Sequence, residues 1–144
     1  MNLKRVSSSR FLTFSIGLVY LWFGVLKYFP NTSHAEKLAK NTIDILTFGL
    51  VPPDVSIILL AISETIIGLL LIFNIRRQLT ISLALIHMLF TFAPLFLFPE
   101  ESFSNSPLVF TLLGQYIFKN IIIIGALLTL YKFPEALRVR LKSL

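Results

Sequence analysis

The chain contains no cysteine among its 144 residues. It therefore cannot use disulfide exchange, a thiolate nucleophile, an iron–sulfur cluster or cysteine-ligated zinc. Membrane redox chemistry that depends on paired cysteines is excluded for the same reason. The sequence also lacks a nucleophile–base pair, metal-ligand spacing and a glycine-rich phosphate loop. It thus predicts no catalytic residue and no metal ligand, and it favours a function other than catalysis.

Charged residues are scarce as well. They make up 14% of the chain, against about 25% in a soluble domain. Apolar residues make up 56%, so too few polar residues remain to cover one globular core in water. The formal net charge of +6 then indicates basic residues at helix ends rather than a nucleic-acid partner. The expected partner is a lipid bilayer.

Four apolar stretches are long enough to cross a membrane, which takes about 20 residues per helix. They are residues 11–29, 55–73, 79–98 and 113–131. In lipid, an unpaired strand would leave its amides unsatisfied, so these stretches are expected to be helices. The sequence therefore predicts an all-α membrane protein, with residues 1–144 forming one transmembrane domain built on a four-helix bundle.

The first connection, between residues 30 and 54, has a helical pattern of its own. Ser33 and Glu36 fit a capping box, and a short amphipathic helix is predicted at about residues 34–48. We expect this helix to lie on the outer membrane surface. At the start of the chain, basic residues precede an apolar run, as in a signal peptide. No small-residue cleavage site follows that run, so it is expected to be a retained first helix.

The distribution of lysine and arginine predicts the orientation, because these residues are enriched on the cytoplasmic side. Four of them fall on the side of the first connection, and nine fall on the side of both termini. We therefore expect the amino and carboxyl termini to be cytoplasmic. The nine are Lys4, Arg5, Arg10, Arg76, Arg77, Lys132, Arg138, Arg140 and Lys142.

Ionisable residues inside the apolar stretches are candidate functional residues, because a charge at mid-membrane costs about 2.5–3.5 kcal/mol or more. At about 1.5 Å per residue, Glu64 lies ~13 Å and Lys119 ~9 Å below the outer edge, close enough in depth to pair. Lys27 lies only ~3 Å below that edge and could extend its ammonium group outward. The predicted ligand-binding or proton-linked residues are Glu64, His87, Gln115, Lys119, Lys27 and Tyr20.

Each stretch has one less apolar side at helical spacing, which predicts a shared polar interior. The four stripes are Gly17, Tyr20, Gly24 and Lys27; Ala61, Glu64 and Gly68; Thr80, His87, Thr91 and Pro94; and Thr111, Gln115, Lys119, Ile122 and Ala126.

Structural interpretations of the same residues stand beside the functional one. Lys27 could be an anchor at the membrane edge, Glu64 and Lys119 could form an ion pair that only fixes helix register, and His87 could be a hydrogen-bonded bundle residue. An acid, a base and an imidazole at related depths nevertheless exceed what packing needs. A buried carboxyl group can also take up a proton when it loses its partner, which makes a proton-linked site a reasonable hypothesis.

Three segments resemble the DoxX-like family of small bacterial four-helix membrane proteins. They are Gly17 to Lys27, Glu64 with the following Ile67 to Leu71, and Gly114 to Asn120. The resemblance implies a four-helix protein of the bacterial inner membrane. Some members are associated with redox systems, including a thiosulfate:quinone reductase and oxidative-stress complexes, and most have no assigned activity. Without cysteine or a pair of haem ligands at matching depths, this chain is not expected to carry electrons alone.

These observations lead to three functional hypotheses. The first is a ligand-binding or accessory protein linked to a redox or quinone system, with a quinone as one candidate ligand and a redox protein as one candidate partner. The second is a small proton-coupled transporter or channel that works as a homo-oligomer. The absence of a second inverted repeat and of any obvious broken helix counts against it. The third is a structural subunit of a membrane complex.

Overall fold

The computed structural model describes residues 3–30, 35–104 and 109–142, and within this part of the chain the regular structure is helical. Phe103 and Phe110 form one isolated antiparallel bridge. The prediction of an all-α fold is therefore confirmed. The helices are α1 (Leu3–Leu26), α2 (Glu36–Leu46), α3 (Pro53–Ile72), α4 (Arg77–Phe90), α5 (Ala93–Leu97), α6 (Pro99–Ser102), α7 (Leu112–Phe118) and α8 (Asn120–Lys142).

Four segments are long and apolar enough to cross a membrane. They are Ser9–Leu26, Pro53–Ile72, Arg77–Leu97 and Leu112–Tyr131, and they overlap the four predicted stretches. The third and fourth are not continuous helices; a kink or helix end at Pro94 was expected, whereas the break in the fourth span was not. The third is interrupted between α4 and α5, next to Pro94, which cannot donate a backbone hydrogen bond. The fourth is interrupted at Lys119, where a tighter turn joins Ile122 N to Lys119 O at 3.1 Å.

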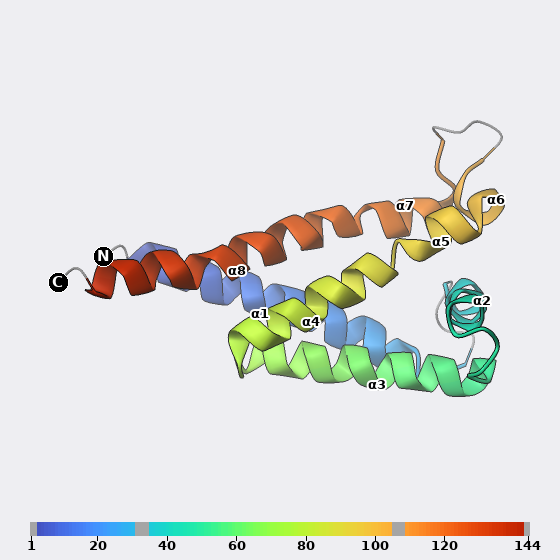
Figure 1. Cartoon of the computed structure of the whole chain (residues 1–144), viewed down its shortest axis with the longest axis horizontal. Helices are drawn as coiled ribbons and strands as arrows, with labels where there is room; N and C mark the ends of the chain where they lie inside the picture. The colour runs from blue at the N-terminus through green and yellow to red at the C-terminus, as the bar shows by residue number, and fades with distance from the viewer. Residues whose placement is uncertain (1–2, 31–34, 105–108, 143–144) are drawn as a thin grey trace.

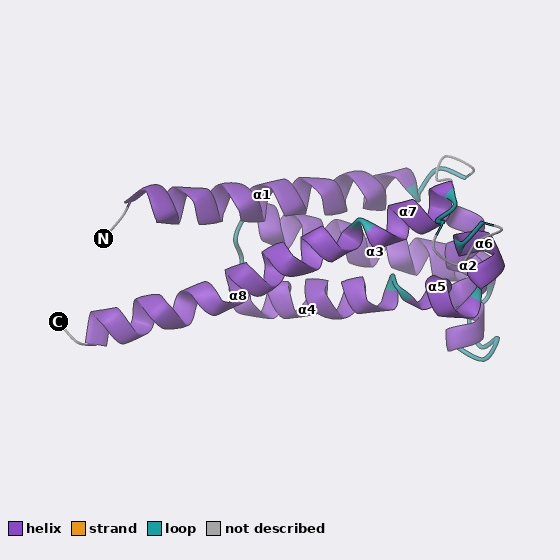
Figure 2. Cartoon of the chain, turned by 90° about the horizontal axis from the view of Figure 1, so that it is seen from above, coloured by secondary structure: helices purple, strands orange, loops and turns teal. Residues whose placement is uncertain are grey.

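The spans run roughly along one long axis. Helix α1 lies along α3, α4 returns from the end of α3, and α8 packs mainly against α4 (Figure 1). Both termini lie at one end of the molecule, and α2, α5 and α6 gather at the other (Figure 2). The described chain thus has a terminal end and an opposite end that carries the short helices.

Glycines bring α1 and α3 unusually close together. A Cβ atom on Gly68 would lie 2.7 Å from the backbone nitrogen of Leu21 and 2.9 Å from the carbonyl oxygen of Gly17. A Cβ on Gly24 would lie 3.2 Å from the carbonyl oxygen of Ala61. Small residues permit this backbone approach in membrane bundles. The predicted facing of the first two stripes is therefore correct, and it brings the polar residues of α1 against α3.

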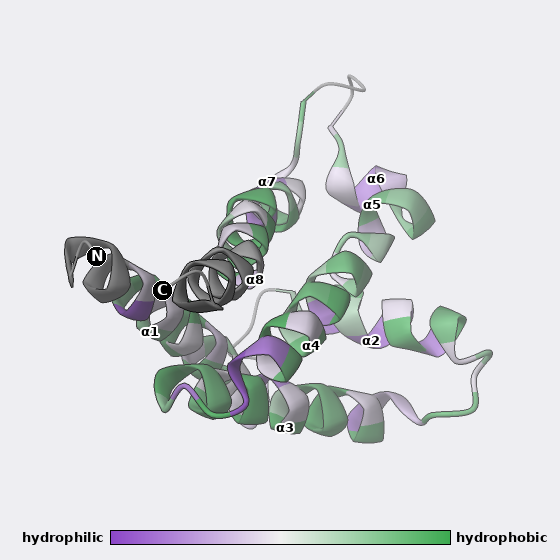
Figure 3. Ribbon diagram, turned by 60° about the vertical axis from the view of Figure 1, so that its left-hand side comes forward, coloured by the Kyte–Doolittle hydropathy of each residue, from purple (hydrophilic) through white to green (hydrophobic). Residues whose placement is uncertain are grey.

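The fourth span is held more loosely than the others. Four of its twenty residues are buried, against seven of twenty in α3. Figure 3 shows that the long helices carry mostly hydrophobic residues, whereas hydrophilic colour gathers at α6 and at the turn between α3 and α4. Many large apolar side chains on the spans are exposed, as expected for helices that contact lipid.

Helix α2 confirms the predicted helix in the first connection but is shorter at both ends. Its N-cap is Ala35, which makes no side-chain capping bond, so the predicted capping box does not start it. Ser33 lies outside the described residues. Lys40 joins α2 to α3 through Asp54 at 2.9 Å and also contacts Glu36 at 3.0 Å. These hydrogen bonds, first that to Asp54, raise the pKa of Lys40 above its ordinary value.

Candidate functional site

A buried ion pair joins α1 to α3. The Nζ atom of Lys27, just beyond the end of α1, lies 2.6 Å from the Oε2 atom of Glu64 in the middle of α3. Both side chains are only 9% exposed. Lys27 also donates to the carbonyl oxygen of Phe23 at 3.3 Å. The charge of Glu64 therefore has a direct partner inside the bundle.

This pair corrects two predictions. Lys27 is not a lysine that extends to the membrane edge, because its ammonium group folds back onto Glu64. Lys119 is not the partner of Glu64, since none of its described interactions involves a carboxylate. The depth estimate failed because it assumed parallel, untilted helices. The close contact at Gly24 instead brings the last turn of α1 beside Glu64.

His87 on α4 lies on the other side of the same carboxylate. Its Nε2 atom is 3.4 Å from the Oε1 atom of Glu64, yet this buried nitrogen makes no hydrogen bond. Its Nδ1 atom is 3.2 Å from the hydroxyl of Tyr20 on α1, which donates to the carbonyl oxygen of Ala84 at 3.0 Å. Three helices thus contribute to one polar cluster, formed by Tyr20, Lys27, Glu64 and His87.

The hydrogen-bond pattern leaves the cluster with two alternative proton arrangements. Tyr20 has one hydroxyl proton. While it donates that proton to Ala84, the Nδ1 atom of His87 must be the donor toward the hydroxyl oxygen. The Nε2 atom of a neutral His87 would then direct a lone pair at the carboxylate oxygen of Glu64, and the two would repel each other. An additional proton on the imidazole or on the carboxyl group removes this repulsion. The hydrogen bonds of Tyr20 therefore determine which ring nitrogen of a neutral His87 carries its proton, and a further proton would have to lie between Nε2 and the carboxylate of Glu64.

Lys119 and Gln115 lie apart from this cluster. Lys119 is exposed and its Nζ atom lies 4.3 Å from the ring centroid of Tyr116 and 5.6 Å from that of Phe23. Gln115 is also exposed and donates to the carbonyl oxygen of Phe110 at 3.4 Å. The cation–π contacts fix the position of the ammonium group, but the rings offer no lone pair to its three N–H donors.

The prediction that Gln115 and Lys119 face the interior of the bundle is therefore wrong. Ile122, which shares that stripe, is 72% exposed. Gly114, Ile117, Leu127 and Leu130 are the buried residues of the span instead. The face of α7 that contains Gly114 is buried because it packs closely: a Cβ atom on Gly114 would overlap the carbonyl oxygen of Ser102. The turn at Lys119 also changes the helical phase between α7 and α8.

The aromatic partners of the two lysines were not predicted, although the sequence contains a signal for them. Phe23 stands four residues before Lys27, and Tyr116 stands three residues before Lys119. At these spacings two side chains meet on one helix face. The ring of Phe23 is close to both ammonium groups, at 5.9 Å from Lys27 and 5.6 Å from Lys119. That shared ring can be seen only in the folded chain.

Replacing Tyr20 by phenylalanine is expected to lower the free energy of unfolding by about 0.5–1.5 kcal/mol. The substitution removes the hydroxyl that contacts both Ala84 and His87 while keeping the ring in the core. Equilibrium unfolding in detergent micelles measures the loss. Tyr131→Phe is the matched control, because Tyr131 is 45% exposed and its loss should stay within about 0.5 kcal/mol. Equal losses in the two variants would contradict the role of the Tyr20 hydroxyl.

The chain matches no protein-family model, no curated protein and no solved structure at a significant level. The resemblance to the DoxX-like family therefore remains a prediction, and the candidate site stands on its own geometry.

Proposed function

We propose that this protein is a DoxX-like membrane protein that binds a lipophilic ligand with a polar head through the polar cluster. The observation that carries the proposal is the Nε2 atom of His87, which is buried without a hydrogen bond beside the carboxylate of Glu64. A buried polar atom without a partner costs about 1–3 kcal/mol. A ligand hydroxyl that donates to this nitrogen, or a ligand oxygen that accepts from the doubly protonated imidazole, would remove that cost.

A quinone is the ligand that we propose first. Its carbonyl oxygens accept hydrogen bonds, which His87 and Lys27 can donate, and the hydroxyl groups of the reduced form can donate to Glu64. The cluster can also supply or accept the proton that accompanies quinone reduction. The link to a redox system and a redox partner protein rests on the DoxX-like resemblance. The sparse contacts between α1 and α8 would let a flat ring enter from the lipid.

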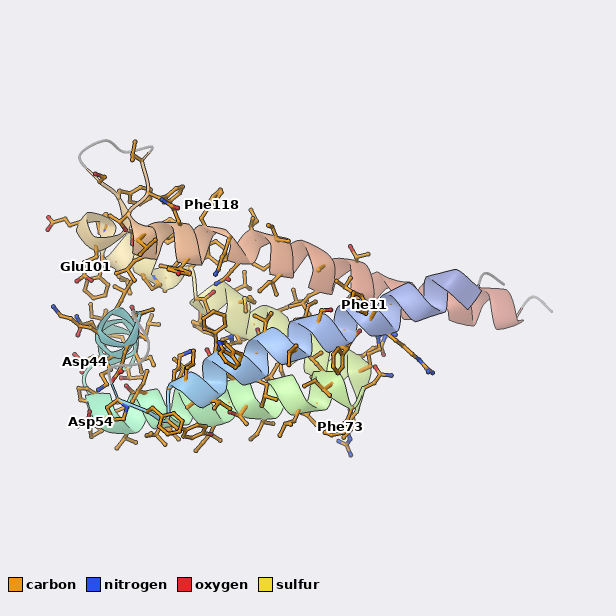
Figure 4. All side chains as sticks on the ribbon, turned by 180° about the vertical axis from the view of Figure 1, so that it is seen from behind. Phe11, Asp44, Asp54, Phe73, Glu101 and Phe118 are labelled. Carbon is orange, nitrogen blue, oxygen red and sulfur yellow. The ribbon has the colours of Figure 1, made fainter. Side chains whose placement is uncertain are left out.

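The proposed setting is the bacterial inner membrane with both termini in the cytoplasm. Nine of the thirteen lysine and arginine residues fall on the side of the termini and four on the other, as the orientation rule requires of a cytoplasmic side. Figure 4 shows the acidic residues Asp44, Asp54 and Glu101 at the opposite end of the molecule. Accessibility of a single cysteine, introduced at Asp54 in this cysteine-free chain, to an impermeant thiol reagent would test this orientation.

Replacing Glu64 by glutamine is expected to abolish binding of a short-chain, water-soluble quinone to the purified protein. The amide removes the negative charge that holds Lys27 and His87 in place. Isothermal titration in detergent measures the affinity. Glu100→Gln is the matched control, because Glu100 is exposed and lies outside the spans. Unchanged quinone binding in the Glu64 variant, or no binding to the unaltered protein, would contradict the proposed function.

A proton-coupled transporter is the second candidate. Two features favour it: the two proton arrangements of Glu64 and His87, and the interruptions in the third and fourth spans. Broken helices are common at the substrate sites of transporters. This candidate requires substrate flux in liposomes that depends on pH and on Glu64, and binding without any flux would exclude it.

A further inference from the structure

A second polar feature lies on the surface of the bundle, and it shares the ring of Phe23 with Lys27 of the polar cluster. At the break between α7 and α8, the ammonium group of Lys119 stands over the rings of Tyr116 and Phe23. These two rings come from different helices, so the position of the ammonium group depends on how α7 sits against α1. We call Lys119, Tyr116 and Phe23 the lysine platform.

The positive charge of the platform is not balanced by an acidic residue. Glu64 is already occupied by Lys27 at 2.6 Å, and it is the only acidic residue within the four spans apart from Asp54 at the start of α3. Among the described interactions of Lys119 there is no ion pair and no side-chain hydrogen bond. Its three N–H donors therefore have no acceptor among the residues that the structure describes.

Apolar residues that neighbour the platform along α1, α7 and α8 are exposed. Trp22 is 65% exposed, Leu112 is 62% exposed and Ile122 is 72% exposed. Lys119 itself lies within the fourth span, roughly 10 Å from its first residue at 1.5 Å per residue. A group that reaches Lys119 from the lipid must therefore combine a negative charge with a hydrocarbon part.

We infer that the lysine platform binds the acidic head of a single-chain amphiphile, a carboxylate or a phosphate, while its hydrocarbon chain lies on the apolar surface of the bundle. The rings hold the ammonium group in one place, and the anion pairs with the side of that group that faces away from them. A neutral head group would leave the charge of Lys119 unbalanced in a medium of low dielectric constant. The platform should therefore distinguish an acid from its ester.

The single tryptophan of the chain gives a direct test. Trp22 is next to Phe23 in the sequence and is exposed, so a brominated fatty acid bound at the platform should quench its fluorescence. The experiment titrates dibromostearate into the full chain in nanodiscs of zwitterionic lipid. We expect Lys119→Gln to weaken the apparent affinity on the order of tenfold and Lys119→Arg to change it less than threefold, because arginine keeps the charge and stacks on rings.

Two controls separate charge from simple partitioning into lipid. Lys37→Gln removes an exposed lysine outside the spans and should leave the affinity unchanged. The methyl ester of the same brominated acid should bind the unaltered protein as weakly as the acid binds the Lys119→Gln variant. Equal quenching by acid and ester, or equal affinity of the acid for the unaltered protein and Lys119→Gln, would overturn the inference.

Competition then identifies the source of the acidic head. Lysophosphatidic acid should displace the brominated acid at micromolar concentration, whereas inorganic phosphate and acetate should fail at millimolar concentration. Displacement by inorganic phosphate would show that the platform binds free anions, and it would overturn the inference that the ligand is an amphiphile. Folding of Lys119→Gln is checked by equilibrium unfolding in mixed micelles, and quinone binding is measured separately, so the platform and the polar cluster can succeed or fail independently.

Discussion

Replacing Lys27 by methionine is expected to lower the free energy of unfolding by about 3–5 kcal/mol, because it leaves the buried carboxylate of Glu64 without its cation. Methionine keeps much of the length of the lysine side chain, so the loss reports the charge more than the packing. Equilibrium unfolding of the purified protein in mixed micelles measures the change. The loss should exceed that of any other single substitution proposed for the candidate site.

A double variant separates the missing ion pair from the missing side chain. Lys27→Met combined with Glu64→Gln removes both charges, so it should be more stable than Lys27→Met alone. Lys40→Met is the matched control, because Lys40 also contacts a carboxylate, Asp54 at 2.9 Å, but in an exposed position. Exposed pairs contribute little, and its loss should be much smaller. A Lys27 variant as stable as the Lys40 variant would refute the buried pair.

Replacing Gly68 by alanine is expected to lower the free energy of unfolding by about 1–3 kcal/mol. The added methyl group would lie 2.7 Å from the nitrogen of Leu21 and 3.1 Å from its Cα atom. These are backbone atoms that cannot turn aside, so α1 and α3 must separate. The separation would also lengthen the contact between Lys27 and Glu64, and quinone binding should weaken with it.

Gly125 offers a control with the same chemical change. A Cβ atom there meets nothing within 4 Å, and alanine is a better helix former than glycine by about 1 kcal/mol. Gly125→Ala should therefore match or exceed the stability of the unaltered protein in the same unfolding assay. The difference between the two variants measures packing alone. If Gly68→Ala were as stable as Gly125→Ala, the close approach of α1 and α3 would be wrong.

The sequence was sufficient for features that depend on local pattern. The length of the apolar runs predicted four spans, and the spacing of Gly17, Gly24 and Gly68 placed these glycines on stripes that face the interior. Tyr20 and His87 were also placed correctly on facing stripes. Each of these predictions needs only the period of a helix and the tendency of small and polar residues to face inward.

The partner of Glu64 could not be predicted in the same way. Choosing between Lys27 and Lys119 requires the tilt of each helix and the distance between neighbours, and a count of residues along straight helices supplies neither. The position of Lys119 depends further on the turn that separates α7 from α8. Its ring contacts with Phe23 and Tyr116 hold its ammonium group away from Glu64, and Lys27 is the lysine that reaches the carboxylate.

The uneven packing of the spans has a consequence for how the protein responds to stress. Helices α1 and α3 pack closely at their glycines and also contain the buried charges. The last span packs mainly against α4, and most of its residues are not buried. Local openings of a protein follow its least protected segments. Amide hydrogens of the α7–α8 segment should therefore exchange with solvent earlier than those of α3, and the carboxyl-terminal span should detach first when the chain is pulled from that end.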